Sequence, residues 1–298
     1  MTAIPDTEKG RAQKPLKGVA LVSIAVMLFA LADVMTKHLT MLYAVPLVVS
    51  VRYLVNLALL VAVFGPRHGR NLVRTNRTGL VILRAVSLAV ASLALGLALR
   101  YMPVGETVAI VYLSPFAVML IAVPLFGEKV GLVGWLGAAA GFLGVLLILR
   151  PGAGLDPVGA GLALITAAAS TVYHLLSRVL ARTEQTIALL FHTALIGALV
   201  FGVMLIWAWD GTLPTLPDFV MMLALGVLAT GGHALFTSAY REAPASLLAP
   251  VNYLHLVWAA LLGWLVFAHL PDAVTIVGMV LVTAAGAGIA LRSHFERP

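Results

Sequence analysis

Polar side chains interrupt one of the most apolar stretches of the sequence, and their types suit contact with a small polar molecule. The stretch AIVYLSPFAVML, residues 109–120, contains Tyr112 and Ser114 directly before Pro115. Proline has no backbone N–H, so Pro115 leaves the carbonyl of Val111 without its helical hydrogen bond. In an apolar surrounding such a carbonyl is tolerated where it is buried in protein or lines a water-filled cavity. This stretch is therefore a candidate cavity wall.

A second polar cluster lies in the stretch APVNYLHLVW, residues 249–258. Asn252 and His255 are three positions apart and share one face of a helix, and Trp258 extends that face. Tyr253 lies one position round from Asn252. Amide, hydroxyl and ring groups together suit a small zwitterion, because its amino and carboxylate groups need hydrogen bonds and its side chain needs an apolar surface. Trp258 could equally serve packing alone.

Further polar residues fall inside apolar segments and belong to the same set of candidates. His174 and His233 are expected to contact a bound molecule, and either could carry a proton. An unpaired arginine inside a membrane costs about 3 kcal/mol or more, so we expect Arg52 to form an ion pair with Asp33. Arg84 lies close enough to the end of its segment to extend to the surface, and we expect no role for it.

These residues have to be positioned by membrane-spanning helices. Of 298 residues, 61% are hydrophobic and 10% are charged, and the mean hydropathy is +1.04. A helix needs about 20 apolar residues to cross a hydrocarbon core of about 30 Å. Segments of that length recur along the chain, which predicts an all-α integral membrane protein with ten transmembrane helices at 17–37, 44–64, 79–100, 105–126, 131–149, 157–180, 185–208, 217–239, 245–267 and 271–291.

The distribution of Lys and Arg predicts the orientation of these helices. Cytoplasmic flanks of membrane helices carry an excess of both residues. If the N-terminal segment 1–16 is cytoplasmic, only Lys37, Arg100 and Arg150 of the 19 Lys and Arg lie on the opposite side. We therefore expect both termini in the cytoplasm, and Glu106 solvated at the outer rim. The same bias explains the pI near 10.0 without a nucleic-acid partner.

The sequence also contains an internal repeat. Tyr253 falls on Tyr112 when the chain is shifted by 141 residues, the difference between their numbers. Several other positions coincide at the same shift: Gly18 with Gly159, Lys37 with Arg178, Arg100 with Arg241, Pro103 with Pro244, and Gly137 with Gly278. Each unit holds five predicted spans, so the second copy starts from the opposite side of the membrane. The prediction is two inverted five-helix repeats at 17–150 and 157–292, an architecture of secondary transporters.

The stretch LRYMPVGETVAIVYLSPFAVMLIAVPLFGEKVG at 99–131 resembles the drug/metabolite transporter superfamily, whose members have paired EamA domains. Its weaker echo is YREAPASLLAPVNYLHLVWAALLGWLVFAH at 240–269, where His269 stands at the position of Glu128. The resemblance covers nearly all of the chain and is nearest to bacterial amino-acid exporters of the YddG type. It implies a carrier that exports amino acids or similar small metabolites across the cell inner membrane, by alternating access between the repeats.

Two alternatives stay open. One is a carrier of another small metabolite or drug of the same superfamily. The other is a membrane-embedded enzyme that uses His174, His233 and Asp33 as acid and base, although no nucleophile accompanies them. The chain has no phosphate-binding glycine loop and no Cys, so we expect no ATP hydrolysis, no metal and no cofactor. The expected partners are a small molecule and the lipid bilayer, with substrate, direction, coupling ion and oligomeric state left open.

Overall fold

The computed structural model describes residues 15–126, 131–150, 154–181, 183–243, 248 and 251–295. The predicted cytoplasmic segment 1–16 lies almost entirely outside these residues. Within them the chain is helical and has no strand. The helices are α1 (Pro15–Leu42), α2 (Val45–His68), η2 (Gly69–Leu72), α3 (Thr78–Tyr101), α4 (Val104–Val111), α5 (Leu113–Phe126), α6 (Leu132–Leu149), α7 (Pro157–Leu180), α8 (Thr186–Ala208), α9 (Leu216–Glu242), α11 (Leu254–Phe267) and α12 (Ala273–Phe295).

Proline and capping side chains determine where several helices begin. The carboxylate of Asp156 accepts hydrogen bonds from the N–H groups of Val158 and Gly159, at 2.8 and 2.9 Å, and Pro157 is the first residue of α7. Thr215 caps α9 in the same way. Proline fits a first turn because the N–H that it lacks has no helical partner there. The connections between helices can therefore be short.

Among the described residues, seven helical segments are long and apolar enough to cross a membrane, judged by length and composition: Leu16–Leu42, Val45–Leu72, Thr78–Tyr101, Val104–Leu125, Pro157–Leu180, Thr186–Ala208 and Leu216–Ala239. Shorter apolar helices occupy Gly134–Leu149, Leu254–Phe267 and Ala273–Gly288. Each segment overlaps one of the predicted spans. The protein is thus all-helical with several membrane-spanning candidates, while the count of ten spans and the inverted relation between repeats stay predictions.

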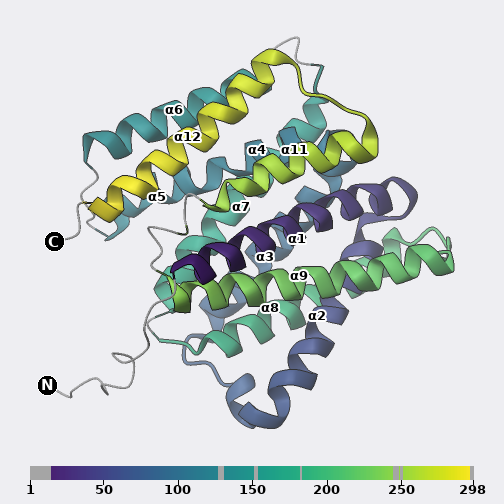
Figure 1. The fold of residues 1–298 in the computed structure, drawn as a ribbon. Helices are drawn as coiled ribbons and strands as arrows, with labels where there is room; N and C mark the ends of the chain where they lie inside the picture. The colour runs from purple at the N-terminus through teal and green to yellow at the C-terminus, as the bar shows by residue number, and fades with distance from the viewer. Residues whose placement is uncertain are drawn as a thin grey trace, which may run out of the picture.

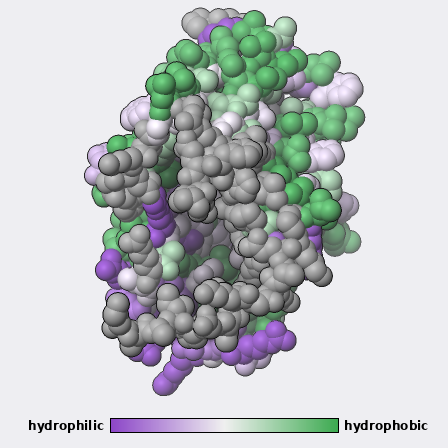
Figure 2. Space-filling model, turned by 60° about the vertical axis from the view of Figure 1, so that its left-hand side comes forward, coloured by the Kyte–Doolittle hydropathy of each residue, from purple (hydrophilic) through white to green (hydrophobic). Residues whose placement is uncertain are grey.

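Large apolar side chains cover much of the outside of the bundle. Leu54, Phe142, Trp207 and Leu265 are among the exposed ones. Figure 2 shows hydrophobic residues over much of the upper and right-hand part of one face, with hydrophilic residues gathered at the lower edge. In water so large an apolar surface would drive association, whereas lipid tails can solvate it. The surface is consistent with the composition and favours a bilayer as the surrounding medium.

The main helix pairs each join the first half of the chain to the second. α1 lies along α9, α3 along α7, α2 along α8 and α6 along α12 (Figure 1). Where α6 crosses α12, a Cβ on Gly144 would lie 2.7 Å from the carbonyl oxygen of Gly278, and a Cβ on Gly278 would lie 2.6 Å from that of Gly144. Small residues let helices in lipid approach closely and gain van der Waals contact. The buried core consequently lies between the two halves.

The break predicted in the fourth span is present. α4 ends at Val111, α5 begins at Leu113, and Tyr112 occupies the turn between them. Pro115 cannot donate to the carbonyl of Val111, which explains the interruption at this point. Tyr253 occupies a similar turn directly before α11. Both tyrosines paired by the repeat therefore lie at places where helical structure is interrupted.

Candidate functional site

Tyr112 and Tyr253 lie against each other. Their ring centroids are 5.0 Å apart and their planes are tilted by 39°. Tyr253 is buried, whereas Tyr112 is partly exposed. The Tyr112 hydroxyl donates a 2.8 Å hydrogen bond to the backbone carbonyl of Asn252. The two helix interruptions therefore meet between the halves of the chain, and a tyrosine hydroxyl links one to the other.

A glycine of α12 makes room for this pair. A Cβ on Gly286 would overlap the hydroxyl and ring of Tyr253, so the side chain of Tyr253 fits only because Gly286 has none. Gly288, two residues further along α12, faces open space. Successive side chains of a helix point in different directions, which is why the two positions differ. Nothing in the sequence distinguishes Gly286 from the many other glycines in apolar segments.

Asp33 pairs with a histidine, and the expected ion pair with Arg52 is not formed. Asp33 Oδ2 lies 3.1 Å from His255 Nε2, and their side chains are 15% and 17% exposed. The guanidinium of Arg52 lies instead over the ring of Tyr53, 5.2 Å from its centroid. The physical reason is the packing of α1, which contacts α9 and α11 far more extensively than α2, the helix that carries Arg52.

Two polar side-chain atoms of this region, one of them in the pair itself, are buried without a hydrogen bond to any described residue. They are Asn252 Oδ1 and His255 Nε2. His255 Nε2 is within ion-pair distance of Asp33 but lacks the angles of a hydrogen bond to it. A buried polar group without a partner costs roughly 1–3 kcal/mol. The cluster can therefore offer an acceptor and an imidazole nitrogen to a bound molecule. The described residues contain no group of three or more His, Cys, Asp or Glu placed to hold a metal ion.

Phe29 of α1 connects the second histidine candidate to this cluster. The centroid of its ring lies 4.9 Å from that of His233 and 6.3 Å from that of His255. A Cβ on Gly232 would lie 2.6 Å from a ring carbon of Phe29, so this glycine lets the ring approach α9. Phe29 could not be selected from the sequence, because a phenylalanine in an apolar helix is usual. It is a candidate wall for the apolar part of a ligand.

The other three predicted binding residues have different surroundings. His174 is exposed and contacts the ring of Tyr173 edge-on, with centroids 5.3 Å apart. Ser114 is buried and accepts a 3.2 Å hydrogen bond from Thr171, which joins α5 to α7. Trp258 packs against two groups of buried apolar residues. The contacts of Ser114 and Trp258 are those of helix packing, and their roles in binding stay predictions.

Arg84 was expected to extend to the surface, and this was wrong. It is 5% exposed. Its guanidinium lies 4.3 Å from the centroid of the Tyr173 ring. It donates hydrogen bonds to the hydroxyls of Ser177, Tyr173 and Thr193 and to the carbonyl oxygen of Leu189, at 2.6, 2.7, 2.8 and 3.3 Å respectively. The physical reason is that α7 and α8 supply enough acceptors at this depth to replace water. Arg84 thus fastens three helices together.

The all-helical fold, the apolar exterior and a polar cluster between two interlocked halves together define a membrane transporter. The sequence profile of the EamA-like transporter family matches residues 16–150 and again residues 157–291. These matches cover nearly the whole chain. The chain belongs to the EamA-like transporter family, within the drug/metabolite transporter superfamily.

Several characterised relatives carry different metabolites. A riboflavin transporter from Rhizobium johnstonii is 30% identical, over 94% of this chain and 92% of its own length. The pseudopaline exporter CntI from Pseudomonas aeruginosa is 30% identical, over 63% of this chain and 66% of its own length. An S-adenosylmethionine uptake transporter from Rickettsia prowazekii is 25% identical, over 91% of each chain. These relatives include an exporter and an uptake transporter.

A solved crystal structure has a similar fold. Its TM-score is 0.66 at 19% sequence identity, and the match covers 94% of this chain and 98% of that chain. At this identity the similarity speaks for the fold alone. The arrangement of helices described above therefore has a counterpart in an experimental structure.

Proposed function

We propose that this protein is a secondary transporter that exports amino acids or similar small metabolites across the cell inner membrane. Its two five-helix repeats, 17–150 and 157–292, would be inverted and give alternate access to a site between them. The observation that carries the proposal is the contact of Tyr112 with Tyr253. Each lies at a helix interruption in a different half, beside the pair of Asp33 with His255.

The chemistry of this cluster supports a zwitterionic substrate. Asp33 supplies a carboxylate that can accept from an ammonium group, and the amide of Asn252 can donate to a carboxylate. Phe29 and the two tyrosine rings offer an apolar wall to an aliphatic side chain. The relatives carry pseudopaline, riboflavin and S-adenosylmethionine, so a different small metabolite is the alternative substrate. An enzymatic role is less favoured because the family consists of transporters.

Paired packing supports the inverted architecture. The contact of α1 with α9 and that of α3 with α7 become each other when the two predicted repeats are exchanged. The same exchange replaces α6 by α12 and α2 by α8, and the reverse. The contact of α6 with α12 and that of α2 with α8 are therefore each left unchanged. In Figure 1, α1 begins and α12 ends at the same end of the bundle, in agreement with an even number of crossings. The profile matches at 16–150 and 157–291 also follow the proposed boundaries.

Flux from reconstituted vesicles tests the substrate. Vesicles are preloaded with labelled amino acids, riboflavin or S-adenosylmethionine, and efflux is compared with that from equally loaded vesicles that contain no protein. We expect amino-acid efflux in the unaltered protein and a reduced rate in the folded Tyr112→Ala, Tyr253→Ala and double variants. Trp207→Ala is the matched aromatic control, since this residue is exposed on the apolar exterior. Normal amino-acid flux in a stably folded double variant would remove both tyrosines from the pathway.

Two other outcomes of the same experiment are decisive. Efflux of riboflavin or S-adenosylmethionine without amino-acid efflux would replace the proposed substrate class. No efflux of any compound across the panel would count against the transporter proposal for this chain.

Labelling of introduced cysteines tests the orientation. The chain has no Cys, so each substitution creates a unique reactive site. Arg74 lies between α2 and α3, and Thr212 lies between α8 and α9. With both termini cytoplasmic, a membrane-impermeant maleimide added to intact cells should label Thr212→Cys and leave Arg74→Cys unlabelled until the membrane is opened. The reverse pattern would invert the proposed topology.

A further inference from the structure

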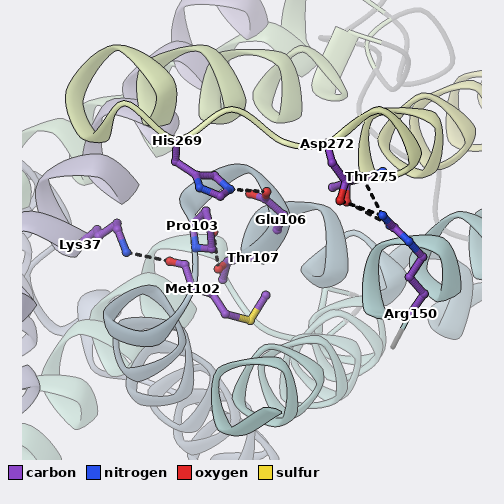
Figure 3. A network of polar contacts seen from close by, with 9 residues as sticks. All are labelled: Lys37, Met102, Pro103, Glu106, Thr107, Arg150, His269, Asp272 and Thr275. Atoms are coloured by element: carbon purple, nitrogen blue, oxygen red, sulfur yellow. Dashed lines mark hydrogen bonds and ion pairs between the residues drawn. The ribbon is translucent and has the colours of Figure 1, made fainter. Parts of the chain in front are cut away.

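A second polar site lies at the end of the bundle where α3 meets α4, apart from the tyrosine pair. It is a pocket of about 320 Å³. Both halves of the chain line it, and its polar members are Lys37, Glu106 and His269. Apolar side chains complete the wall, among them Met41 and Phe267. Figure 3 shows the three polar residues converging from α1, from α4 and from the segment after α11.

Glu106 is buried in this wall and only half satisfied, although a solvated position was expected for it. The residue is 2% exposed. One carboxylate oxygen, Oε1, lies 2.9 Å from His269 Nε2 in a hydrogen bond. The other, Oε2, has no hydrogen-bond partner among the described residues. A carboxylate oxygen removed from water without a partner carries a high desolvation cost. The pocket therefore contains an acceptor that a ligand can satisfy.

Lys37 supplies the opposite charge from α1. Its ammonium donates to the carbonyl oxygens of Leu99 and Met102, at 2.7 and 2.8 Å. These bonds use two of its three N–H donors. Lys37 and Glu106 both line the pocket. A cationic donor and an anionic acceptor thus face the same small space, which is the arrangement that recognises a zwitterion.

We propose that this pocket is a second binding site, which takes the head group of an apolar α-amino acid. The ammonium of the ligand donates to Glu106 Oε2, and its carboxylate accepts from Lys37. Met41 and Phe267 contact the aliphatic side chain. Pockets of about 300 Å³ suffice for small ligands, so the volume fits one amino acid. The inference rests on the proposed transport function, and it adds a site near one membrane surface where the substrate binds on its way past.

Cysteine protection measures occupancy of this pocket directly. Met41 is 55% exposed and lines the pocket, so Met41→Cys reports access with no competing thiol in the chain. L-leucine is the probe. At leucine concentrations ten times the dissociation constant, reaction with a maleimide should slow by about tenfold. Thr212→Cys, in an exposed connection, is the control and should react at an unchanged rate.

Leucine analogues and pocket variants identify the head-group contacts. Isoamylamine lacks the carboxylate and 4-methylpentanoate lacks the amino group, and each should protect Met41→Cys far less than leucine. Adding Glu106→Gln or Lys37→Met to Met41→Cys should abolish protection by leucine. Equal protection by isoamylamine would overturn the zwitterion assignment in favour of a cation site. If high salt without leucine protects Met41→Cys as well as leucine does, the zwitterion assignment is likewise overturned, and the ligand is an inorganic cation.

Flux measured on the unaltered protein, beside protection of Met41→Cys, separates this inference from the proposed function. Amino-acid flux without protection by leucine would overturn the second site and leave the transporter intact. Protection without flux would establish the site and remove the proposed transport function. Protection that survives both Glu106→Gln and Lys37→Met would place the ligand elsewhere.

Discussion

Arg84 and Asp33 are charged side chains inside the same helix bundle, and their surroundings differ in how completely they are satisfied. Arg84 donates four hydrogen bonds to residues of α7 and α8 and lies over an aromatic ring. Asp33 has an imidazole nitrogen at 3.1 Å without hydrogen-bond geometry. Arg84 lies on α3, which packs against α7, and Asp33 lies on α1, which packs against α9.

The difference separates a structural role from a binding role. Arg84 uses four of its five N–H donors, so it has little capacity left for a ligand, and removing it strands its partners. A charge beside unpartnered polar atoms costs stability and keeps the capacity to bind. Arg84 therefore holds helices together, while the proposed function places Asp33 in the transport pathway, and the following variants test that division.

The largest effect is expected from Arg84→Ala. Four acceptors on two neighbouring helices lose their donor, so the free energy of unfolding should fall on the order of 2–4 kcal/mol. Thermal denaturation in detergent, followed by size-exclusion chromatography, measures the loss. Arg74→Ala removes an exposed arginine and is the matched control. Equal stability of the two variants would contradict the structural assignment of Arg84.

Gly286→Ala disturbs the binding region without altering a charge. The added methyl group would overlap Tyr253, so the ring or α12 has to move, at a cost of about 1–3 kcal/mol. Flux should decrease as well, because Tyr253 leaves its contact with Tyr112. Gly288→Ala, where a methyl group meets open space, should match the unaltered protein in both measurements. If both variants behave alike, the position of Tyr253 does not depend on this contact.

Asp33→Asn keeps the shape of the side chain and removes its charge. We expect flux in reconstituted vesicles to fall about tenfold, equivalent to about 1.4 kcal/mol, because the ammonium of the substrate loses its ionic partner. Stability should change little, since few contacts depend on that charge. Asp210→Asn, in an exposed connection, serves as the control. A large loss of stability with unchanged flux would show that Asp33 has the structural role given to Arg84 and no role in transport.

The smallest effect is expected from an exposed ion pair. Asp272, directly before α12, accepts hydrogen bonds from the N–H of Thr275 and from Arg150 (Figure 3). These contacts lower the pKa of Asp272 to about 2, with the Thr275 N–H as the largest cause. A lowered pKa stabilises the fold above the unfolded value of 3.8, and this contribution is lost as the pH falls toward 2. Asp272→Asn should therefore lower the Tm slightly at neutral pH.

Measuring the Tm of both proteins against pH checks this last expectation. The difference between them should be constant above pH 3.8 and should shrink toward pH 2. A difference that persists unchanged at the lowest pH would show that the charge of Asp272 is not its cause.

The features that could be predicted from the sequence are local or repeated. Pro115 removes a specific hydrogen bond, so the interruption at Tyr112 follows from one residue. The repeat singled out Tyr112 and Tyr253 as a pair, and the structure brings their rings into contact. Asp33, His255 and Asn252 were recognised as candidates because polar groups inside apolar segments are costly.

What could not be predicted depends on which helices become neighbours. The predicted partner of Asp33 was wrong. Arg52 was chosen because its estimated depth in the membrane is similar to that of Asp33, whereas contact also requires the two helices to pack side by side. Arg84 finds its acceptors on α7 and α8, roughly a hundred residues away in sequence. Phe29 and Gly286 cannot be recognised as part of the site from the sequence, since their residue types are common in apolar helices. The depth of a residue in the membrane can be estimated from the sequence. The neighbouring helix that the residue faces can be identified only from the fold.

The interlocking of the halves has a consequence for biogenesis. Each of the four main pairs, α1 with α9, α2 with α8, α3 with α7 and α6 with α12, takes one helix from each half. At synthesis rates of about 5–20 residues per second, the first helix of each pair waits between about 4 and 40 seconds in the membrane for its partner. During that time Arg84 has none of its acceptors from α7 and α8. The nascent first half is therefore the stage at which membrane chaperones have the most to protect.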